Sequence, residues 1–301
     1  MIKRLSIYFR EMYPLIPRLF LGFLLFFEIY FLTILTNTEA SMPFQIGISE
    51  IVGGITIFSF LLCIRIADDF KDFETDSRLF PERPLPSGRV KKKDLAVVLS
   101  VVIFVTVLLN LIFMNNLPFF LFLAAYGLLM SFWFFRKYKI QKNLMLALVT
   151  HNPVQLVMNL YTISFACIKY DIPFFTINNL LILLTLYFPG LVWEIVRKIR
   201  APKEETDYVT YSKLFGIKKP LFIVMGIMLL DLLTTSALVW QLYPWAALSV
   251  VLAYAWLLWQ VCLFIKNPER FKLVQRFEIY EYIAETSVVF FIAAYVLNWW
   301  K

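Results

Sequence analysis

Residues that often bind metals through sulfur or imidazole are scarce in this chain, which has one histidine and three cysteines among 301 residues. Cys63, Cys167 and Cys262 lie far apart and lack the spacing of metal ligands. We therefore expect the cysteines to pack as small apolar residues. Long polar segments are also lacking, because charged residues make up 17% of the chain and are confined to short runs. This distribution excludes a long soluble insertion between the apolar stretches.

Long apolar stretches fill most of the sequence. Hydrophobic residues make up 60% of the chain, which is more than a soluble protein of this length could cover. A membrane helix needs roughly 20 apolar residues. Nine stretches meet that length: 17–36, 49–67, 94–114, 117–135, 143–167, 178–197, 220–240, 244–265 and 278–299. The sequence thus predicts an all-α integral membrane protein with about nine spans, forming a single domain over residues 1–301.

The excess of basic residues follows the expected topology. If the N-terminus is cytoplasmic, 27 of the 29 Lys and Arg residues fall on that side, and only Lys169 and Lys301 fall on the other. This positive-inside pattern explains the net charge of +8 without a nucleic-acid partner. The first apolar run is long enough to span and lacks a small-residue cleavage site, so we expect no cleavable signal peptide. We expect a multi-pass protein of the bacterial cytoplasmic membrane, with its N-terminus and charged loops in the cytoplasm.

Four aspartates gather at the cytoplasmic end of the second predicted span: Asp68, Asp69, Asp72 and Asp76. Asp68, Asp72 and Asp76 are spaced by four, so on a helix they stack along one face, with Asp69 beside them. Carboxylates this close repel one another unless cations neutralise them. Hard oxygen ligands suit Mg²⁺, which commonly carries the phosphates of a substrate. The aspartates therefore predict a Mg²⁺ site for a diphosphate at the membrane surface.

A turn rich in proline and arginine follows the aspartates, with the sequence Pro81-Glu-Arg83-Pro84-Leu-Pro86-Ser-Gly88. Arg83 offers planar donors to phosphate oxygens, and the prolines stiffen the turn that directs it. With the aspartates, this turn resembles the motif of the UbiA superfamily of intramembrane prenyltransferases, Asn-Asp-x-x-Asp-x-x-x-Asp followed by Arg-Pro-x-Pro-Ser-Gly. Asp68 stands where the family usually has Asn. The phrase from Thr210 to Gly216 stands where the family has Thr-Leu-Pro-Val-x-x-Gly, and the resemblance covers the whole chain.

The resemblance implies both a fold and an activity. It implies a UbiA-type helical bundle around a central cavity that opens to the cytoplasmic side. It also implies that the protein ionises an isoprenyl diphosphate with Mg²⁺ and transfers the prenyl group to an aromatic or other lipophilic acceptor. The expected metal ligands are Asp68, Asp69, Asp72 and Asp76. The expected diphosphate-binding residues are Arg83, Arg197 and Lys198.

The second motif departs from the family pattern. Family members place Asp-x-x-x-Asp at the end of the sixth span, whereas here Glu194 keeps one carboxylate and Lys198 replaces the other. The interpretation we favour is that Lys198, with Arg197, contacts the diphosphate and replaces part of a second Mg²⁺. Glu194 is then a metal ligand or the base that removes the acceptor's proton. Alternatively, these charges only anchor the helix, or the lost ligand comes from Glu204, Glu205 or Asp207.

Polar residues within the predicted spans are costly in a bilayer and are therefore candidates for function. They are Glu28, His151, Asn152, Asn159, Asp231, Glu278, Glu281 and Glu285. Pro153 leaves a backbone carbonyl without its helical partner, so His151 or Asn152 either satisfies that carbonyl or contacts substrate. The three glutamates recur along one face of the last span. We expect that face to line the cavity or to pair with Arg276 or another cation.

Two other functions stay open at this stage. Some members of the superfamily cyclise the isoprenyl chain without an acceptor, and the altered second motif makes a membrane terpene cyclase the main alternative. A transporter that uses the acidic cluster for cations is the non-enzymatic alternative. It predicts acidic residues deep within several spans, whereas here the densest carboxylates lie at one surface.

Overall fold

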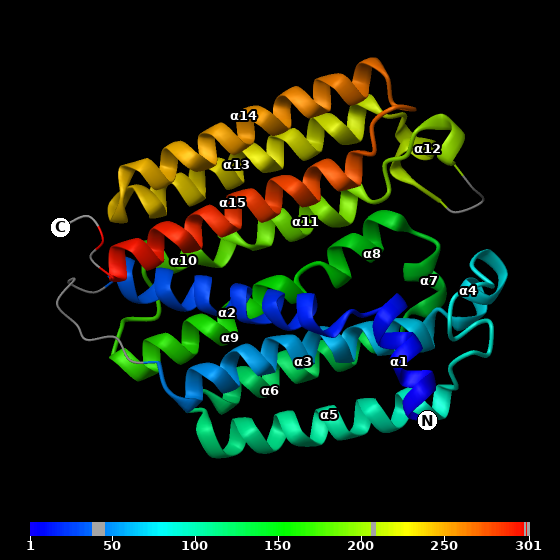
Figure 1. Cartoon of the computed structure of the whole chain (residues 1–301), viewed down its shortest axis with the longest axis horizontal. Coiled ribbons are helices and arrows are strands. Elements are labelled where there is room, and N and C mark those ends of the chain that lie inside the picture. The colour runs from blue at the N-terminus through cyan, green and yellow to red at the C-terminus, as the bar shows by residue number, and fades with distance from the viewer. Residues whose placement is uncertain (38–45, 206–208, 298, 300–301) are drawn as a thin grey trace. The chain divides into compact units, whose positions relative to one another are not determined.

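The computed structural model describes residues 1–37, 46–205, 209–297 and 299. These residues form 15 α-helices and two short 3₁₀ segments and contain no strand (Figure 1). Their contacts divide the chain into two compact units. Unit 1 comprises Met1–Phe27 and Met42–Lys139, and unit 2 comprises Glu28–Ser41 and Ile140–Lys301. The all-α fold that the sequence predicts is confirmed.

The described residues contain seven helical segments that are long and apolar enough to cross a bilayer, one of which consists of two consecutive helices. They are α2 (Leu15–Asn37), α3 (Ile48–Lys71), α5 (Lys92–Phe113), the pair α10 (Ile177–Thr185) and α11 (Tyr187–Val196), α13 (Lys218–Leu242), α14 (Pro244–Lys266) and α15 (Leu273–Val296). They correspond to seven of the predicted spans. The stretches 117–135 and 143–167 contain shorter helices, so the total of nine spans stays a prediction.

The stretch 143–167 is not one continuous helix as predicted. It divides into α8 (Leu144–His151) and α9 (Val154–Tyr170). Pro153 lies at the break, where its ring removes a backbone donor and cannot continue the helical hydrogen bonds. The stretch 117–135 also ends early, because α6 (Leu117–Ser131) gives way to the 3₁₀ segment η1 (Trp133–Phe135). Both predicted spans were therefore too long as single helices.

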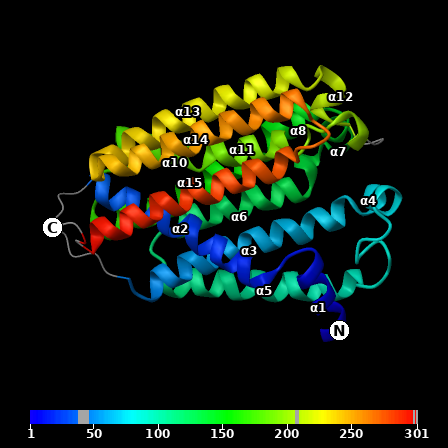
Figure 2. The same ribbon diagram turned by 45° about the horizontal axis from the view of Figure 1, so that its top comes forward.

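Unit 1 contains both the N-terminal helix, α1 (Ile2–Glu11), and the loop that carries the first motif. Besides the membrane helices already named, it also contains α4 (Phe73–Leu79) and the start of α7 (Lys137–Gln141). α3 packs along α5 and also contacts α6 (Figure 2). A buried core joins the loop between α4 and α5 to α1 and α3, and its members are Tyr8, Tyr13, Leu62, Ile66, Leu85, Val90 and Leu95. This core fixes the motif loop to the end of the membrane helices.

Unit 2 is built around three long helices that lie side by side in both ribbon views, α13, α14 and α15 (Figures 1 and 2). α11 packs on α13 and α15 and so places the end of the predicted sixth span against this group. The loop after α11 contains the 3₁₀ segment η2 (Pro202–Glu204) and the short helix α12 (Tyr211–Phe215). At the other end of the helices, the amide nitrogen of Asn37 donates to the side-chain oxygen of Asn179 at 3.0 Å.

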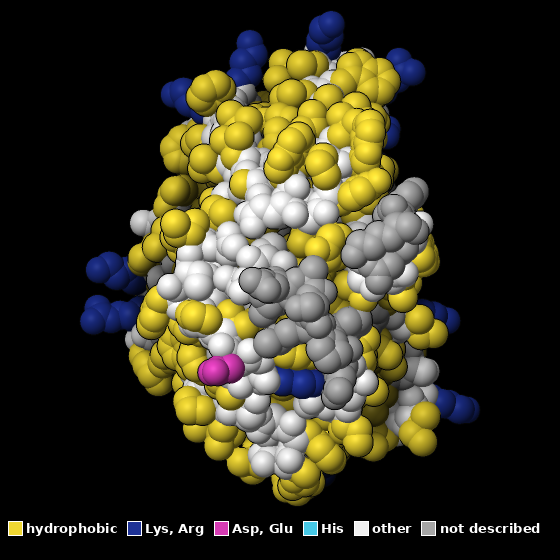
Figure 3. All heavy atoms as spheres, turned by 90° about the vertical axis from the view of Figure 1, so that its left-hand side faces the viewer, with side chains coloured by type: hydrophobic (Ala, Val, Ile, Leu, Met, Phe, Trp, Pro, Cys, Tyr) yellow, Lys and Arg dark blue, Asp and Glu magenta, His cyan; other side chains and the backbone are white. Residues whose placement is uncertain are grey.

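Apolar side chains cover much of the molecular surface. On the face in Figure 3, hydrophobic side chains predominate and acidic side chains are scarce. Strongly exposed apolar side chains occur on several membrane helices. Phe104 on α5 is 68% exposed, and Phe222 on α13 is 84% exposed. Water would not tolerate so large an apolar surface on a monomeric protein. The surface therefore fits a chain that is surrounded by lipid.

Candidate functional site

The first motif lies where α3 ends and α4 begins. Asp68 and Asp69 occupy the last turn of α3, Asp72 lies between the two helices, and Asp76 belongs to α4. Helical hydrogen bonds run through this junction. The N–H of Asp72 donates to the carbonyl of Asp68 at 2.9 Å, and the N–H of Asp76 donates to the carbonyl of Asp72 at 2.8 Å. The four-residue register predicted from the sequence is therefore kept in the backbone.

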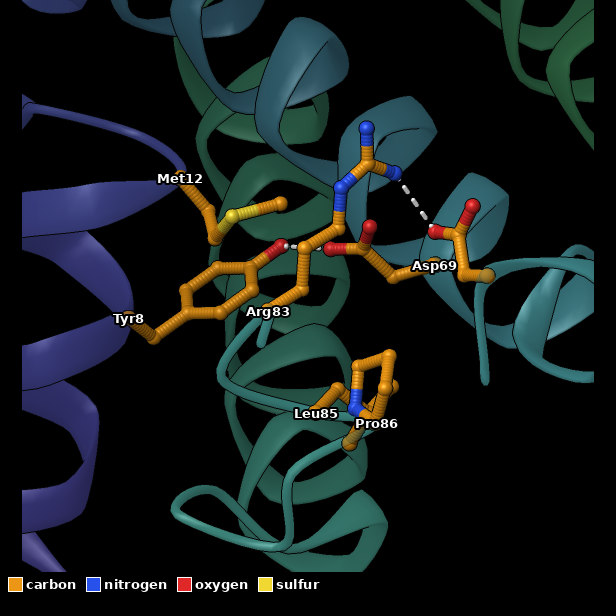
Figure 4. A pocket seen from close by; sticks show the side chains of 7 residues that line it. Tyr8, Met12, Asp69, Arg83, Leu85 and Pro86 are labelled. Carbon is orange, nitrogen blue, oxygen red and sulfur yellow. Dashed lines mark hydrogen bonds and ion pairs between the residues drawn. The ribbon is translucent and has the colours of Figure 1, made fainter. Parts of the chain in front are cut away.

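The side chains do not form the simple stack that the spacing suggests. Asp69 and Asp76 line one small pocket, together with Tyr8, Met12, Arg83, Leu85 and Pro86 (Figure 4). Three of the four carboxylates each contact a different cation. The ion pairs are Lys71–Asp68 at 2.6 Å, Arg65–Asp69 at 2.7 Å and Arg83–Asp76 at 2.8 Å. The repulsion expected among the aspartates is thus relieved by cations of the chain itself.

Asp69 is held from two sides. The hydroxyl of Tyr8 donates to Oδ2 of Asp69 at 2.6 Å, and Nη2 of Arg65 donates to Oδ1 at 2.7 Å. Tyr8 is fully buried and Asp69 is 6% exposed. Burial, with the adjacent Asp69 charge, raises the pKa of the Tyr8 phenol above its ordinary value. Tyr8 therefore remains a protonated donor at physiological pH.

Asp72 differs from its neighbours because its carboxylate forms no hydrogen bond or ion pair with the residues that the structure describes. Burial raises the pKa of this carboxyl to about 6. Lys71 opposes the increase, while the nearby charges of Asp68 and Asp76 add to it. A partly buried carboxylate without a partner is poorly stabilised and gains most from an added cation.

Arg83 is fixed by the turn that the prolines shape. Its N–H donates to the carbonyl of Phe80 at 3.1 Å, and its guanidinium lies 4.0 Å from the centre of the Phe80 ring. The turn closes when the N–H of Val90 donates to the carbonyl of Pro84 at 2.9 Å. Gly88 has φ of +75°, a conformation that side chains disfavour. Arg83 is still 32% exposed at its side chain, so further N–H groups can reach a ligand.

The chemistry of these donors fits Mg²⁺, although the side chains are arranged around cations of the chain. Within the described residues, no three acidic, histidine or cysteine side chains converge as a ready-made metal site. Carboxylate oxygens are nevertheless the ligands that Mg²⁺ prefers. Asp72 is open, the side chain of Asp68 is 39% exposed beside Lys71, and Asp76 contacts Arg83, whose side chain is 32% exposed. A metal would therefore compete with Lys71 and Arg83 for these carboxylates.

The second motif forms a compact group of three charges at the C-terminal end of α11. Nη2 of Arg197 lies 2.6 Å from Oε2 of Glu194, and Nζ of Lys198 lies 2.8 Å from Oε1. The Lys198 residue is 7% exposed, whereas the side chain of Arg197 is 45% exposed and covers Trp193. One carboxylate between two cations leaves a local charge of +1. This group is suited to attract an anion rather than to hold a metal by itself.

The longer loop after α11 uses Glu205 to fix its own fold. The carboxylate of Glu205 accepts hydrogen bonds from the hydroxyl of Thr210 at 2.8 Å and from the hydroxyl of Ser212 at 2.5 Å. Thr210 also caps α12 by accepting from the N–H of Lys213 at 3.1 Å. Glu204 is exposed at the end of η2. Asp207, the third predicted replacement ligand, lies outside the described residues.

His151 and Asn152 stand at the break between α8 and α9. Nδ1 of His151 lies 3.2 Å from the carbonyl oxygen of Ala147 and 3.0 Å from the hydroxyl of Thr150. The imidazole thus contacts the last turn of its own helix. The side-chain oxygen of Asn152 is buried and has no hydrogen-bond partner among the described residues.

The glutamates of α15 face other carboxyl groups. The charges of Glu285 and Asp231 of α13 act on Glu28 of α2, and those of Glu278 and Glu285 act on Glu281. Both carboxylate oxygens of Glu28 are buried and have no hydrogen-bond partner among the described residues. Glu28 is fully buried and Asp231 is 4% exposed. Within the described ranges, no Lys or Arg forms an ion pair with these glutamates, so the expected partner Arg276 does not contact them.

Sequence reasoning missed the N-terminal helix. Leu5, Tyr8, Phe9 and Met12 recur with the spacing of one helical face, and this pattern could have predicted an amphipathic helix before the first span. Nothing in the spacing could have shown which residue its tyrosine contacts. The partner, Asp69, lies 61 positions along the chain.

Comparison with known proteins agrees with the motifs. Residues 49–280, which include both motifs, match the sequence model of the UbiA prenyltransferase family. No curated protein matches the sequence significantly. A solved structure of a digeranylgeranylglyceryl phosphate synthase is similar in fold, with a TM-score of 0.64 and 16% sequence identity. The similarity covers 98% of this chain and 99% of that one.

Proposed function

We propose that this chain, which belongs to the UbiA prenyltransferase family, is a Mg²⁺-dependent enzyme that transfers the prenyl group of an isoprenyl diphosphate to a lipophilic acceptor. Family membership and the fold make it a membrane prenyltransferase in general. The need for Mg²⁺, the roles of individual residues and the kind of acceptor are what we propose. We further propose that residues 1–301 act as one catalytic domain, with both motifs on the cytoplasmic side of a bacterial cytoplasmic membrane.

The observation that carries the proposal is the state of Asp72. It is a partly buried carboxylate without a side-chain partner in the described residues. It lies one helical turn from Asp68 and from Asp76, and Asp76 pairs with Arg83. Asp68, Asp69, Asp72 and Asp76 would hold the metal. Mg²⁺ bound there would supply positive charge to the leaving diphosphate. A solvated acidic loop would have no reason to keep such a carboxylate out of water.

The chain's own cations would complete the leaving-group site. Arg83 keeps most of its N–H groups available while Phe80 and Asp76 fix its plane. Its planar donors match two phosphate oxygens. In the reaction the allylic C–O bond breaks and its electron pair leaves with the diphosphate. Donors that meet this developing charge lower the barrier.

In the second motif, we propose that Lys198 and Arg197 bind diphosphate oxygens. Their shared carboxylate, Glu194, balances only one of the two charges. Glu194 then fixes both cations and, in the proposed reaction, is also a candidate to receive the proton that the acceptor loses as its new bond to the prenyl carbon forms. The interpretation in which Glu205 replaces the lost metal ligand is less favoured, because its oxygens already accept two hydroxyl groups.

The acceptor is proposed to be an aromatic or another lipophilic nucleophile. The structurally similar protein is a digeranylgeranylglyceryl phosphate synthase, so a prenylated glyceryl phosphate belongs in the same panel as aromatic acceptors. Purified protein in lipid nanodiscs should be supplied with Mg²⁺, labelled allylic diphosphates of several lengths and each acceptor in turn. We expect a prenylated product that requires both Mg²⁺ and an acceptor.

A membrane terpene cyclase is the second candidate, favoured by one feature, the replacement of the family's aspartate by Lys198. The same assay separates the two activities. A hydrocarbon or terpene alcohol released from the allylic diphosphate without any acceptor would overturn the transferase and support the cyclase. Absence of all diphosphate consumption, with protein that is folded and lipid-embedded, would overturn both.

A further inference from the structure

α1 is fastened at three places along its length, one at the start of α5 and two at the first motif and the turn that follows it. Near its start, Arg4 forms two hydrogen bonds with Asp94 at the beginning of α5, at 2.5 and 2.9 Å. In its second half, Tyr8 donates to Asp69. The third contact joins Glu11, at the end of the helix, to the motif loop.

That third contact is a two-pronged ion pair. Nη1 and Nη2 of Arg89 donate to the two carboxylate oxygens of Glu11 at 2.7 and 2.9 Å. Nη2 of Arg89 also donates to the carbonyl of Glu82, at 2.7 Å. Arg89 thereby links the end of α1 to the same turn that carries Arg83. Two parallel hydrogen bonds fix orientation as well as distance.

The middle contact differs from the outer two because it is buried and directed at an expected metal ligand. The outer pairs are partly exposed, so each contributes little to stability by itself. Tyr8 is fully buried and its hydroxyl lies 2.6 Å from Oδ2 of Asp69. In Figure 4 the Tyr8 ring extends from α1 into the pocket that Asp69 and Arg83 also line. The ring packs in the core of unit 1. The hydroxyl also donates a hydrogen bond to Asp69, and packing of the ring does not require that bond.

We propose that Tyr8 is a positioning residue for the first motif, and that the contacts of Arg4 and Glu11 hold α1, and with it Tyr8, in place. We call α1 with these contacts the strap. This inference rests on the proposed Mg²⁺-diphosphate function and assigns a role to a helix that lies outside both motifs and before the residues matched by the family model. The Tyr8 hydroxyl and the Arg65 guanidinium set the plane of the Asp69 carboxylate from opposite oxygens.

The physical reason is preorganisation. A carboxylate at the end of a helix can rotate, and a metal that binds it must then pay for fixing that rotation. Hydrogen bonds from groups behind a ligand remove this freedom beforehand, and losing one typically costs about 10- to 100-fold in metal affinity or activity. Each carboxylate oxygen has a second lone pair, so a bond from Tyr8 leaves Asp69 able to bind metal.

The test compares two tyrosines of the same segment. Tyr8→Phe removes the hydroxyl from Asp69 and keeps the ring. Tyr13→Phe is the matched control, because Tyr13 is also buried but donates to a backbone carbonyl, that of Phe58, at 3.3 Å. Mn²⁺ binding to each protein with inorganic pyrophosphate is measured by electron paramagnetic resonance, without turnover. Turnover is then measured as a function of Mg²⁺ concentration.

We expect Tyr8→Phe to weaken Mn²⁺ binding and to raise the half-saturating Mg²⁺ concentration by about 10-fold, with a smaller effect on kcat at saturating metal. Tyr13→Phe should match the wild type in both. Equal metal dependence in Tyr8→Phe and Tyr13→Phe would overturn the proposed role. A protein that melts at a much lower temperature with unchanged metal affinity would show that Tyr8 serves packing only.

Failure of the proposed function gives a different pattern. In that case the wild type itself would bind no Mn²⁺ with pyrophosphate, and Asp72→Asn would be indistinguishable from it. Glu11→Gln supplies a further check on the strap, since it weakens the Arg89 contact without touching Asp69. We expect it to speed amide exchange in α1 and to move the Mg²⁺ requirement in the same direction as Tyr8→Phe, by a smaller factor; unchanged exchange and Mg²⁺ requirement would refute the strap.

Discussion

Nζ of Lys198 lies 2.8 Å from Oε1 of Glu194, one helical turn earlier, and the lysine is 7% exposed. The family has a second carboxylate at this position, which here is an ammonium group held by the first. A buried charge is costly unless a partner of opposite sign lies beside it. Arg197 occupies the other oxygen of Glu194. Where the family has a pair of anions, the second motif here has one anion that holds two cations.

Lys198→Ala should weaken binding of the allylic diphosphate more than it slows the chemical step. Removing one charge-assisted hydrogen bond costs about 1.5–3 kcal/mol, so we expect KM to rise by roughly 10- to 100-fold. Glu194 keeps its contact with Arg197, so folding should be preserved. Lys203→Ala, at an exposed position in η2, is the control. An unchanged KM with a lowered melting temperature would show that Lys198 only anchors the helix.

Arg83→Lys should lower kcat/KM even though it keeps the positive charge. Lysine cannot present two parallel donors or stack in a plane over Phe80, and we expect a loss of about 10- to 100-fold. Arg78→Lys, at an exposed site in the same helix–turn segment, should have almost no effect. Steady-state kinetics of both variants decide the matter, and equal activity of Arg83→Lys and wild type would contradict the role given to the guanidinium.

Asp72→Asn should make the metal-free protein more stable at about pH 7.5. The ordinary pKa of this carboxyl is 3.8, and burial raises it to about 6 in the folded protein. Between those values the folded state holds a proton that the unfolded chain has lost, so the free energy of unfolding falls as pH rises through this window and stays lower above it. Asparagine does not titrate, so the variant does not lose this stability as the pH rises. We therefore expect its melting temperature to be higher by about 2–4 °C.

The control for that experiment is Glu74→Gln, because the Glu74 side chain is 91% exposed on α4. It should melt with the wild type. A melting temperature of Asp72→Asn at or below that of the wild type would mean that Asp72 has a stabilising partner and is not an open ligand.

Removing the metal should stop turnover, and acid should imitate its removal. Chelation with EDTA is expected to abolish product formation, and added Mg²⁺ should restore it. Because a proton and Mg²⁺ compete for Asp72, the half-saturating Mg²⁺ concentration should rise as pH falls below about 6. Initial rates over a grid of pH and Mg²⁺ concentration measure this. A half-saturating concentration that does not change across this range would contradict the assignment of Asp72.

Much of the first motif could be predicted from the sequence because its spacing is local. Asp72 and Asp76 follow Asp68 at helical intervals, and the backbone hydrogen bonds keep that register through the junction of α3 and α4. The cations that balance the aspartates were also close in sequence, yet spacing alone did not select them. Arg65 and Lys71 each lie within one turn of their partners.

Contacts between distant segments could not be predicted. Tyr8 meets Asp69, Glu11 meets Arg89 and Arg4 meets Asp94 across 61, 78 and 90 positions, respectively. Such pairs depend on how α1 folds back, which no periodicity in either segment encodes. The break between α8 and α9 at Pro153 could have been predicted, because proline itself interrupts helical hydrogen bonds. The stretch 143–167 was nevertheless predicted as one span, because its length and hydropathy alone were considered.

If the first motif ionises an isoprenyl diphosphate, the double variant Asp72→Ala with Asp76→Ala should be inactive. Wild type and variant, both in nanodiscs and shown to be folded by circular dichroism, are incubated with labelled allylic diphosphate, Mg²⁺ and the acceptor panel. We expect diphosphate release and prenylated product from the wild type, and neither above background from the variant. Undiminished turnover by the folded double variant would contradict this expectation.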